Sequence, residues 1–193
     1  NAKTVRPSVC NALDTLLVTT WRDGRLLATR RDARVALNAY LDDHAFLLAA
    51  LLEMLQTRFR PSDFEWACAI ADALLERFED PVAGGFFFTS HDHEKLFHRT
   101  KPGPDSATPS GNGAAALALI ALGQLAGEIR YGEAARRTVE LFAGAMAESP
   151  AGHSTLLGAL SRLQTPPALV LLQGDAAITA QWQRALESRY RPE

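Results

Sequence analysis

Charged and polar side chains that could do chemistry gather in two short segments of this sequence. Asp42, Asp43 and His44 stand together where an apolar helical pattern begins. The segment 99–113 holds the second set, and because it also contains three prolines and three glycines it cannot be a regular helix. Its candidate residues are Arg99, Lys101, Asp105, Ser110 and Asn112. Loops of this kind commonly carry functional groups on a rigid scaffold.

The two acids Asp43 and Asp105 are the candidate catalytic pair. Asp43 could act as a general base or accept hydrogen bonds from sugar hydroxyls. Asp105 would supply the second carboxylate that glycoside chemistry requires, while Arg99 can bind a carboxylate or hydroxyl in fork geometry. We therefore predict one depression at the loop end of the helices, lined by Asp43, His44, Arg99, Asp105 and Asn112, with Lys101 and Ser110 as further substrate-binding residues.

A purely structural interpretation of the same residues stays open. An acid at a helix start can cap free N–H groups, and His44 can pack against the first turn. Ser110 can cap the next helix, and Arg99 can pair with Asp105 to hold the loop. The Asp43→Asn substitution separates the two interpretations. If Asp43 belongs to a binding site, the variant should lose ligand binding and keep its melting temperature. If Asp43 only caps the helix, the variant should lose stability and keep ligand binding.

A metal site is a weaker alternative. His91 and His93 form a His-x-His pair, with Asp92 between them and His98 nearby. Zinc needs a third ligand, and none stands at a convincing spacing. We interpret these residues as the polar tip of a β-hairpin and predict neither a metal nor a cofactor.

The elements that must position these residues are mainly helices. Apolar side chains recur at spacings of three and four, as in an amphipathic helix. About seven helices are predicted, over residues 9–17, 42–58, 61–78, 110–127, 131–148, 153–163 and 176–190. Leu51 and Leu119 lie in the middle of apolar faces and should be core residues.

Short strands are expected between some of these helices. Asp23-Gly24 between apolar stretches indicates a β-hairpin at 19–29, and the aromatic run that starts at Phe86 indicates a second one at 86–97. The run Leu169–Leu172 predicts a short buried strand. Because the helical hairpins have unlike loops and no repeat near 34 residues is evident, we predict an all-α fold that is part of an α/α toroid rather than a regular solenoid.

Composition limits the class of protein. The chain has 193 residues, of which 47% are hydrophobic and 22% are charged, and this length predicts a single domain over 1–193. A net charge of −2 argues against nucleic acid as a partner. No apolar stretch reaches the roughly 18 residues of a membrane helix. Cys10 and Cys68, far apart in sequence, predict free thiols and a cytoplasmic protein.

Three strings in register carry a resemblance to a known family. They are 41–46 (LDDHAF), 84–87 (GGFF) and the run Arg99-x-Lys101, Asp105, Pro109-Ser110-Gly111-Asn112. In order and separation they resemble the C-terminal part of the spermatogenesis-associated protein 20 family. His44 replaces the usual Tyr of that pattern, and Gly113 replaces its final Ser.

The resemblance implies an architecture and two classes of function. Family members carry a thioredoxin-like domain ahead of a toroid similar to those of N-acylglucosamine 2-epimerase and the six-hairpin glycosidases. The thioredoxin-like domain is absent from this chain, and a complete ring needs twelve helices, so only part of the toroid is expected. The chain is then either part of a carbohydrate-directed isomerase, epimerase or hydrolase, or a non-catalytic binding or scaffold domain. The implied partners are a carbohydrate, the adjacent thioredoxin-like domain and a second copy that covers an exposed apolar flank.

Overall fold

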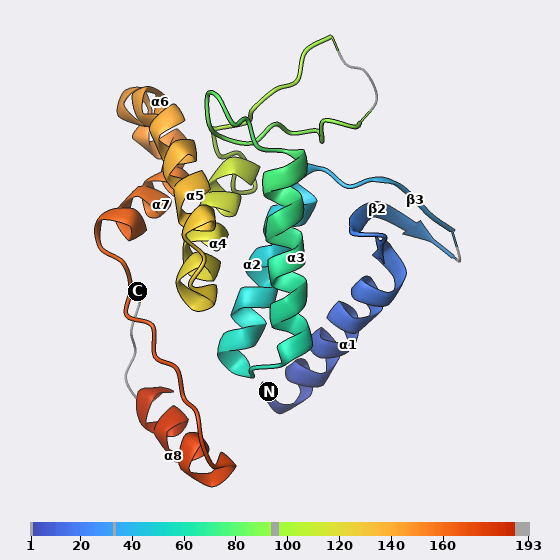
Figure 1. Cartoon of the computed structure of the whole chain (residues 1–193), viewed down its shortest axis with the longest axis vertical. Coiled ribbons are helices and arrows are strands. Elements are labelled where there is room, and N and C mark those ends of the chain that lie inside the picture. The colour runs from blue at the N-terminus through green and yellow to red at the C-terminus, as the bar shows by residue number, and fades with distance from the viewer. Residues whose placement is uncertain (1, 33, 94–96, 188–193) are drawn as a thin grey trace.

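Helices dominate the computed structural model of the chain, which describes residues 2–32, 34–93 and 97–187 (Figure 1). The predicted fold class is confirmed. In chain order the elements are α1 (Ala2–Thr20), β1 (Trp21–Arg22), β2 (Arg25–Arg31), β3 (Arg34–Asn38), α2 (Leu41–Thr57), α3 (Pro61–Arg77), α4 (Gly111–Ala126), α5 (Ile129–Leu141), α6 (Ala143–Glu148), the 3₁₀ turn η1 (Pro150–His153), α7 (Ser154–Gln164) and α8 (Ala176–Glu187). Each of these helices lacks the length or the apolar character needed to cross a membrane.

The helices form two layers. α4 packs between α2 and α7, while α3 packs on α2 and α5 packs on α4. The connections between α2 and α3 and between α4 and α5 are short, at 58–60 and 127–128, so each pair is an antiparallel hairpin. The described parts of the long connection between α3 and α4, 78–93 and 97–110, lie at the end where α4 begins (Figure 1). This order of inner and outer helices agrees with the expected partial toroid.

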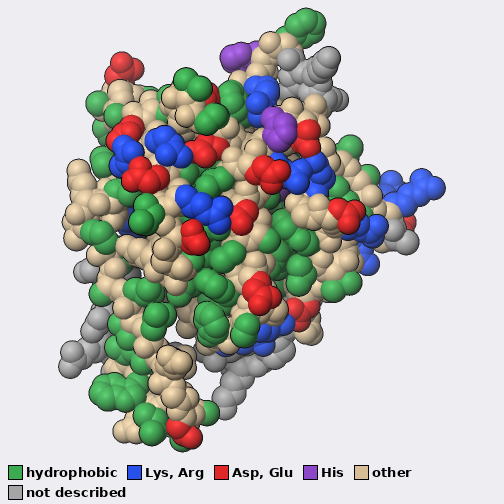
Figure 2. All heavy atoms as spheres, in the orientation of Figure 1, with side chains coloured by type: hydrophobic (Ala, Val, Ile, Leu, Met, Phe, Trp, Pro, Cys, Tyr) green, Lys and Arg blue, Asp and Glu red, His purple; other side chains and the backbone are tan. Residues whose placement is uncertain are grey.

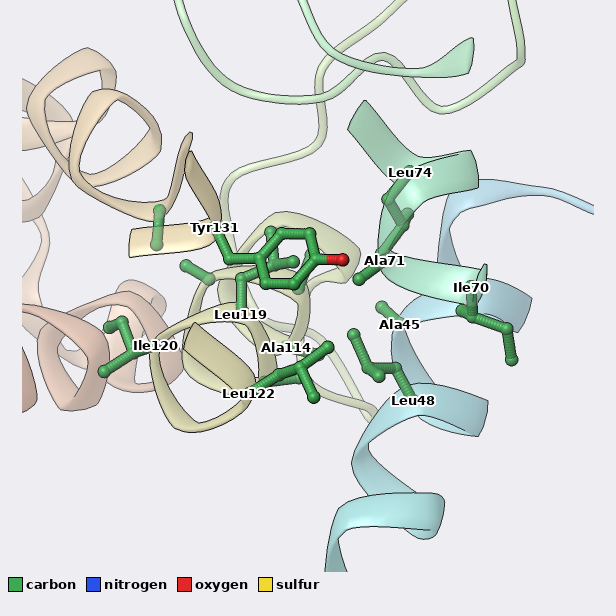
Figure 3. Close-up of a cluster of buried hydrophobic side chains, with 14 of the residues drawn as sticks. Ala45, Leu48, Ile70, Ala71, Leu74, Ala114, Leu119, Ile120, Leu122 and Tyr131 are labelled. Carbon is green, nitrogen blue, oxygen red and sulfur yellow. The ribbon is translucent and has the colours of Figure 1, made fainter. Parts of the chain in front are cut away.

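The core lies where α2, α3, α4 and α5 face one another (Figure 3). α4 is rich in alanine and is buried on most sides, as expected for a helix that is apolar all round. Small side chains allow its neighbours to approach closely. The labelled core residues are Ala45, Leu48, Ile70, Ala71, Leu74, Ala114, Leu119, Ile120, Leu122 and Tyr131. The core is therefore shared by both hairpins.

Leu51 and Leu119 are both fully buried, as predicted. Replacing either with Ala should lower the free energy of unfolding by about 2–5 kcal/mol, because apolar burial is lost and a cavity remains. Urea denaturation measures the change. Val82→Ala is the matched control, since Val82 is 94% exposed and its truncation should be nearly neutral. Equal, small effects in all three variants would contradict this description of the core.

The first predicted β-hairpin is present and is extended by a third strand. β1, β2 and β3 form an antiparallel sheet in that order. The turn between β1 and β2 places Asp23 and Gly24 at φ values of 52° and 70°, which are left-handed conformations that Asp and Gly adopt most readily. The Asp-Gly signal is therefore a correct predictor of this turn.

The prediction of a second β-hairpin at 86–97 is wrong for the residues that the structure describes. Phe86 forms a single β-bridge with Glu79. The Phe88 carbonyl accepts from the Leu41 N–H, and the Phe88 N–H donates to the Thr100 carbonyl. The aromatic run is thus bonded to segments outside the predicted hairpin. Residues 94–96 lie outside the described part.

Two further differences concern the C-terminal half. The predicted helix 131–148 is divided at Phe142, whose ring packs against Gly103 so closely that a Cβ there would lie 2.5 Å from it. Leu169–Leu172 is neither a strand nor buried, and its four side chains are 41–67% exposed. A strand needs a neighbour for its backbone groups, and the described chain supplies none there.

Candidate functional site

The candidate site lies at the end of the helical body where α2, α4 and α7 begin. Asp43 and His44 stand in the first turn of α2, and Ser110 and Asn112 stand at the start of α4. Residues 97–110, which contain the other candidates, lie at this same end (Figure 1). The local geometry at each candidate residue determines what it can do chemically.

Asp43 acts as a helix cap on one side and faces solvent on the other. One of its carboxylate oxygens, Oδ2, accepts from the Tyr40 backbone N–H at 2.8 Å. An acid at this position satisfies an otherwise unpaired donor and is favoured by the helix dipole. Its side chain is exposed, so a ligand could still reach it.

His44 is 2% exposed and belongs to the helical interior. Its Nδ1 lies 2.8 Å from the Tyr40 carbonyl oxygen, and its ring packs against Phe78 with ring centroids 4.8 Å apart. Burial lowers the pKa of His44, which keeps the imidazole neutral near pH 7. The geometry therefore ties His44 to packing at the start of α2.

Both carboxylate oxygens of Asp105 are occupied by the protein itself. Oδ1 accepts from the Ser110 N–H at 2.8 Å, and Oδ2 accepts from the Thr155 N–H at 2.9 Å. The Asp105 N–H in turn donates to the Gly152 carbonyl at 2.7 Å. Burial opposes ionisation, but these hydrogen bonds prevail and lower the pKa of Asp105. Asp105 thus joins the start of α4 to the start of α7.

Ser110 and Asn112 have equally definite partners. The Ser110 hydroxyl caps α4 by accepting from the Gly113 N–H at 3.1 Å. Asn112 is fully buried, and its Oδ1 accepts from the Phe86 N–H at 2.7 Å. Its Nδ2 donates to the Phe86 and Pro102 carbonyls, both at 2.9 Å. This amide therefore holds two loop segments against α4.

Arg99 and Lys101 both lie against the ring of Phe87. The Arg99 guanidinium carbon is 4.0 Å from the ring centroid, and the Lys101 Nζ is 4.7 Å from it. Arg99 also donates to the Thr89 carbonyl. The expected ion pair between Arg99 and Asp105 is replaced by these contacts, because backbone donors already satisfy Asp105.

Lys101 also secures the turn that contains the Gly-Gly-Phe-Phe string. Its Nζ donates to Asp80 Oδ2 and to the Gly84 carbonyl, both at 2.7 Å. The second oxygen of Asp80 accepts from the Val82 and Ala83 N–H groups. Gly84 has a φ of 76°, and a Cβ there would lie 2.7 Å from the Arg137 carbonyl oxygen. Only glycine fits this position.

Asp42, one of the two adjacent acids at the start of α2, has an unusual environment. Its Oδ1 is buried and has no hydrogen-bond partner among the described residues. It lies against Gly111, where a Cβ would approach the oxygen to 2.1 Å. Burial, together with the charge of Asp43, raises the pKa of Asp42. The only signal in the sequence was the pair of adjacent acids.

His153, at the start of α7, has no distinguishing signal in the sequence. It is 4% exposed, its Nδ1 lies 2.9 Å from the Ser149 carbonyl oxygen, and its Nε2 is buried without a partner in the described chain. Its charge would favour the ionised form of Asp105. Asp42, Arg99 and His153 are thus among the side chains at this end with a buried polar atom that has no hydrogen-bond partner in the described part of the chain.

Asp92, from the rejected metal set, belongs to an ionic cluster. It pairs with Arg25 of β2 and with Arg77 of α3, and it accepts from the Ser90 hydroxyl at 2.8 Å. The hydrogen bond from Arg25 is the main cause that lowers the pKa of Asp92. Within the described ranges, no group of three or more His, Cys, Asp or Glu side chains could hold a metal ion.

The pKa of Asp80 offers a test of the Lys101 contact. Hydrogen bonds from Lys101 and then from the Ala83 and Val82 N–H groups lower the pKa of Asp80 to about 2. A lowered pKa in the folded state contributes stability above the unfolded value near 3.8. We expect this contribution to be lost as the pH falls from about 4 towards 2.

Replacing Lys101 with Met should move the Asp80 pKa back towards its ordinary value and weaken this pH dependence. The Asp80 carboxyl signal, followed by NMR through an acid titration, measures the pKa directly. Arg136→Met, on the exposed face of α5, is the control and should leave it unchanged. A wild-type Asp80 pKa near 3.8 would contradict the Lys101 contact.

These features define the chain as a mostly helical domain. At one end of its two helical hairpins, hydrogen bonds join the loop residues to the starts of α4 and α7. No family model matches the chain. Spermatogenesis-associated protein 20 from mouse is 27% identical over 137 residues, that from rat is 28% identical and that from human is 26% identical. Each match covers 70% of this chain but 17% of the relative. The predicted resemblance is confirmed, and the chain is similar to a limited part of spermatogenesis-associated protein 20.

Proposed function

We propose that this chain is a non-catalytic binding and scaffold domain of a larger protein, which serves an adjacent thioredoxin-like domain. One observation carries the proposal. The polar residues of the family run, from Lys101 to Asn112, form hydrogen bonds with the backbone of the chain itself. Side chains that hydrogen-bond to the backbone fix the conformation of the loop and are not free to take part in a reaction.

The electrostatics of Asp105 support this proposal. A general acid or base works best when its pKa lies near the working pH. The pKa of Asp105 is shifted in the opposite direction, below its ordinary value. Proton transfer to this carboxylate would also weaken its hydrogen bonds to the starts of α4 and α7. In this proposal Asp105 has a structural role, while exposed Asp43 remains able to bind a hydroxyl-rich ligand.

A carbohydrate-directed enzyme is the second candidate, and Asp42 favours it. Its Oδ1 has no partner among the described residues and its pKa is raised, so Asp42 holds a proton more readily than an ordinary aspartate, as a general acid must. In this version Asp42 replaces Asp105 as the acid and Asp43 is its neighbour in the same helical turn. The family resemblance to sugar-modifying toroids is the basis for the substrate class.

The two candidate functions differ in whether a carbohydrate is converted to product. The full-length protein should be screened against sugars and sugar phosphates, with both thermal shift and product formation as readouts. A binding domain should give shifts without product, and Asp43→Asn should reduce the shifts. Product formation that Asp42→Asn abolishes, while the melting temperature is retained, would replace the binding proposal with the enzymatic one. Asp23→Asn, in the exposed β1–β2 turn, is the matched control.

A further inference from the structure

The C-terminal arm and α8 carry an apolar surface that the helical body does not cover. We define the arm as residues 165–175. In Figure 1 it runs in an extended course, and α8 lies apart from the helical body at its end. Ile178 and Trp182 stand four residues apart, on one face of α8, and are 57% and 60% exposed. Figure 2 shows hydrophobic side chains over this region, at lower left.

A groove of complementary character lies between α4, α5 and α7. Its volume is about 440 Å³. Ile120, Ile129 and Leu163 supply apolar lining, and Ile129 is 82% exposed. Gly127 and Gly132 also line it, and a Cβ at either position would meet no other atom, so the groove is open there. Four charged residues, Glu128, Glu133, Arg136 and Arg162, line it as well. The apolar face of α8 matches the apolar part of this lining.

The connection between α7 and α8 differs from the other hairpin connections. α2 is joined to α3 through 58–60, and α4 to α5 through 127–128, whereas the arm takes 165–175. Pro166 and Pro167 stiffen its start and favour an extended course away from α7. Pro166 itself lines the groove, so the arm leaves directly from the rim. This geometry carries α8 away from the groove of its own chain.

We propose that two copies of this chain exchange their arms, so that α8 of each copy lies in the groove between α4, α5 and α7 of the other. The exchange also accounts for the apolar run Leu169–Leu172. Two identical arms that cross at a two-fold axis run antiparallel, and each supplies the strand neighbour that the other lacks. The predicted strand would then form between copies.

The size of the exchanged segment suits a stable dimer. The arm and α8 together run from residue 165 to residue 187. A standard protein interface uses about 20–30 residues from each side. The apolar side chains available are Leu169, Val170, Leu171, Leu172, Ile178 and Trp182 from the arm and α8, and Ile129 from the groove. Both copies contribute the same surfaces, as a two-fold interface requires.

Two single substitutions test the exchange from its two sides. Trp182→Asp places a charge on the apolar face of α8, and Ile129→Asp places a charge in the lining of the groove. Both side chains are mostly exposed in the single chain, so each variant should fold, which circular dichroism verifies. We expect sedimentation to show a dimer for the wild type and a dimer dissociation constant at least about 100-fold weaker for each variant. Val82→Asp, elsewhere on the surface, should remain dimeric.

Mixing the two variants provides the decisive measurement. The Trp182→Asp copy retains an intact groove, and the Ile129→Asp copy retains an intact α8. An equimolar mixture should therefore form heterodimers with one docked α8, at a concentration at which each variant alone is a monomer. A wild-type monomer at tens of micromolar would overturn the proposal, whether its Trp182 fluorescence is that of an exposed side chain or that of α8 docked in its own groove. A dimer that persists in both variants would overturn it as well.

Discussion

Replacing Asp105 with Ala is expected to lower the free energy of unfolding by about 4–5 kcal/mol. The Ser110 and Thr155 N–H groups would lose their acceptor, and each unsatisfied donor costs about 1–3 kcal/mol. The loop would also lose the link between α4 and α7, together with a carboxylate placed favourably at two helix N-termini. Urea denaturation at pH 7 measures the loss.

Two further variants make the Asp105 result informative. Asp105→Asn keeps the shape of the side chain and one acceptor oxygen, so it should fall between the wild type and the alanine variant. Asp43→Ala removes a single capping bond and should cost only about 1 kcal/mol. If Asp105→Ala cost no more than Asp43→Ala, the carboxylate would be free for chemistry, and the scaffold proposal would lose its main support.

The Asn112→Ala variant should lose about 4–6 kcal/mol, which is much of the stability of an ordinary domain. The side chain is fully buried, and its removal leaves the Phe86 N–H, the Phe86 carbonyl and the Pro102 carbonyl without their partner. Each orphaned buried group costs about 1–3 kcal/mol. Far-ultraviolet circular dichroism through a thermal melt reports the change.

The Asn112→Asp variant separates the hydrogen bond that the amide accepts from the two that it donates. Aspartate retains an acceptor for the Phe86 N–H but cannot donate to the two carbonyls, so it should also be strongly destabilised. Asn11→Ala, at an exposed site on α1, is the control and should be nearly neutral. Retained stability in Asn112→Ala would mean that the amide is available to bind a ligand.

The local features of this fold could be predicted from the sequence. Apolar side chains three and four positions apart specify a helix face wherever the helix packs, so α2, α3, α4 and α7 were placed close to their observed bounds. The turn at Asp23-Gly24 was also predictable, because it depends on the conformations of two adjacent residues. The three strings that carry the family resemblance could be recognised for the same reason, because each is a short run of neighbouring residues.

The roles of the site residues depended on the tertiary structure. Asp105 and Asn112 could be identified as special, but their partners are Thr155, 50 positions later, and Phe86, 26 positions earlier. Only the packing of α4 beside α7 and beneath the loop brings these backbone groups within hydrogen-bond distance. The same packing buries one oxygen of Asp42 against Gly111, where no described residue forms a hydrogen bond with it. A carboxylate's solvation and neighbours set its pKa, and both are properties of the folded chain rather than of residue type.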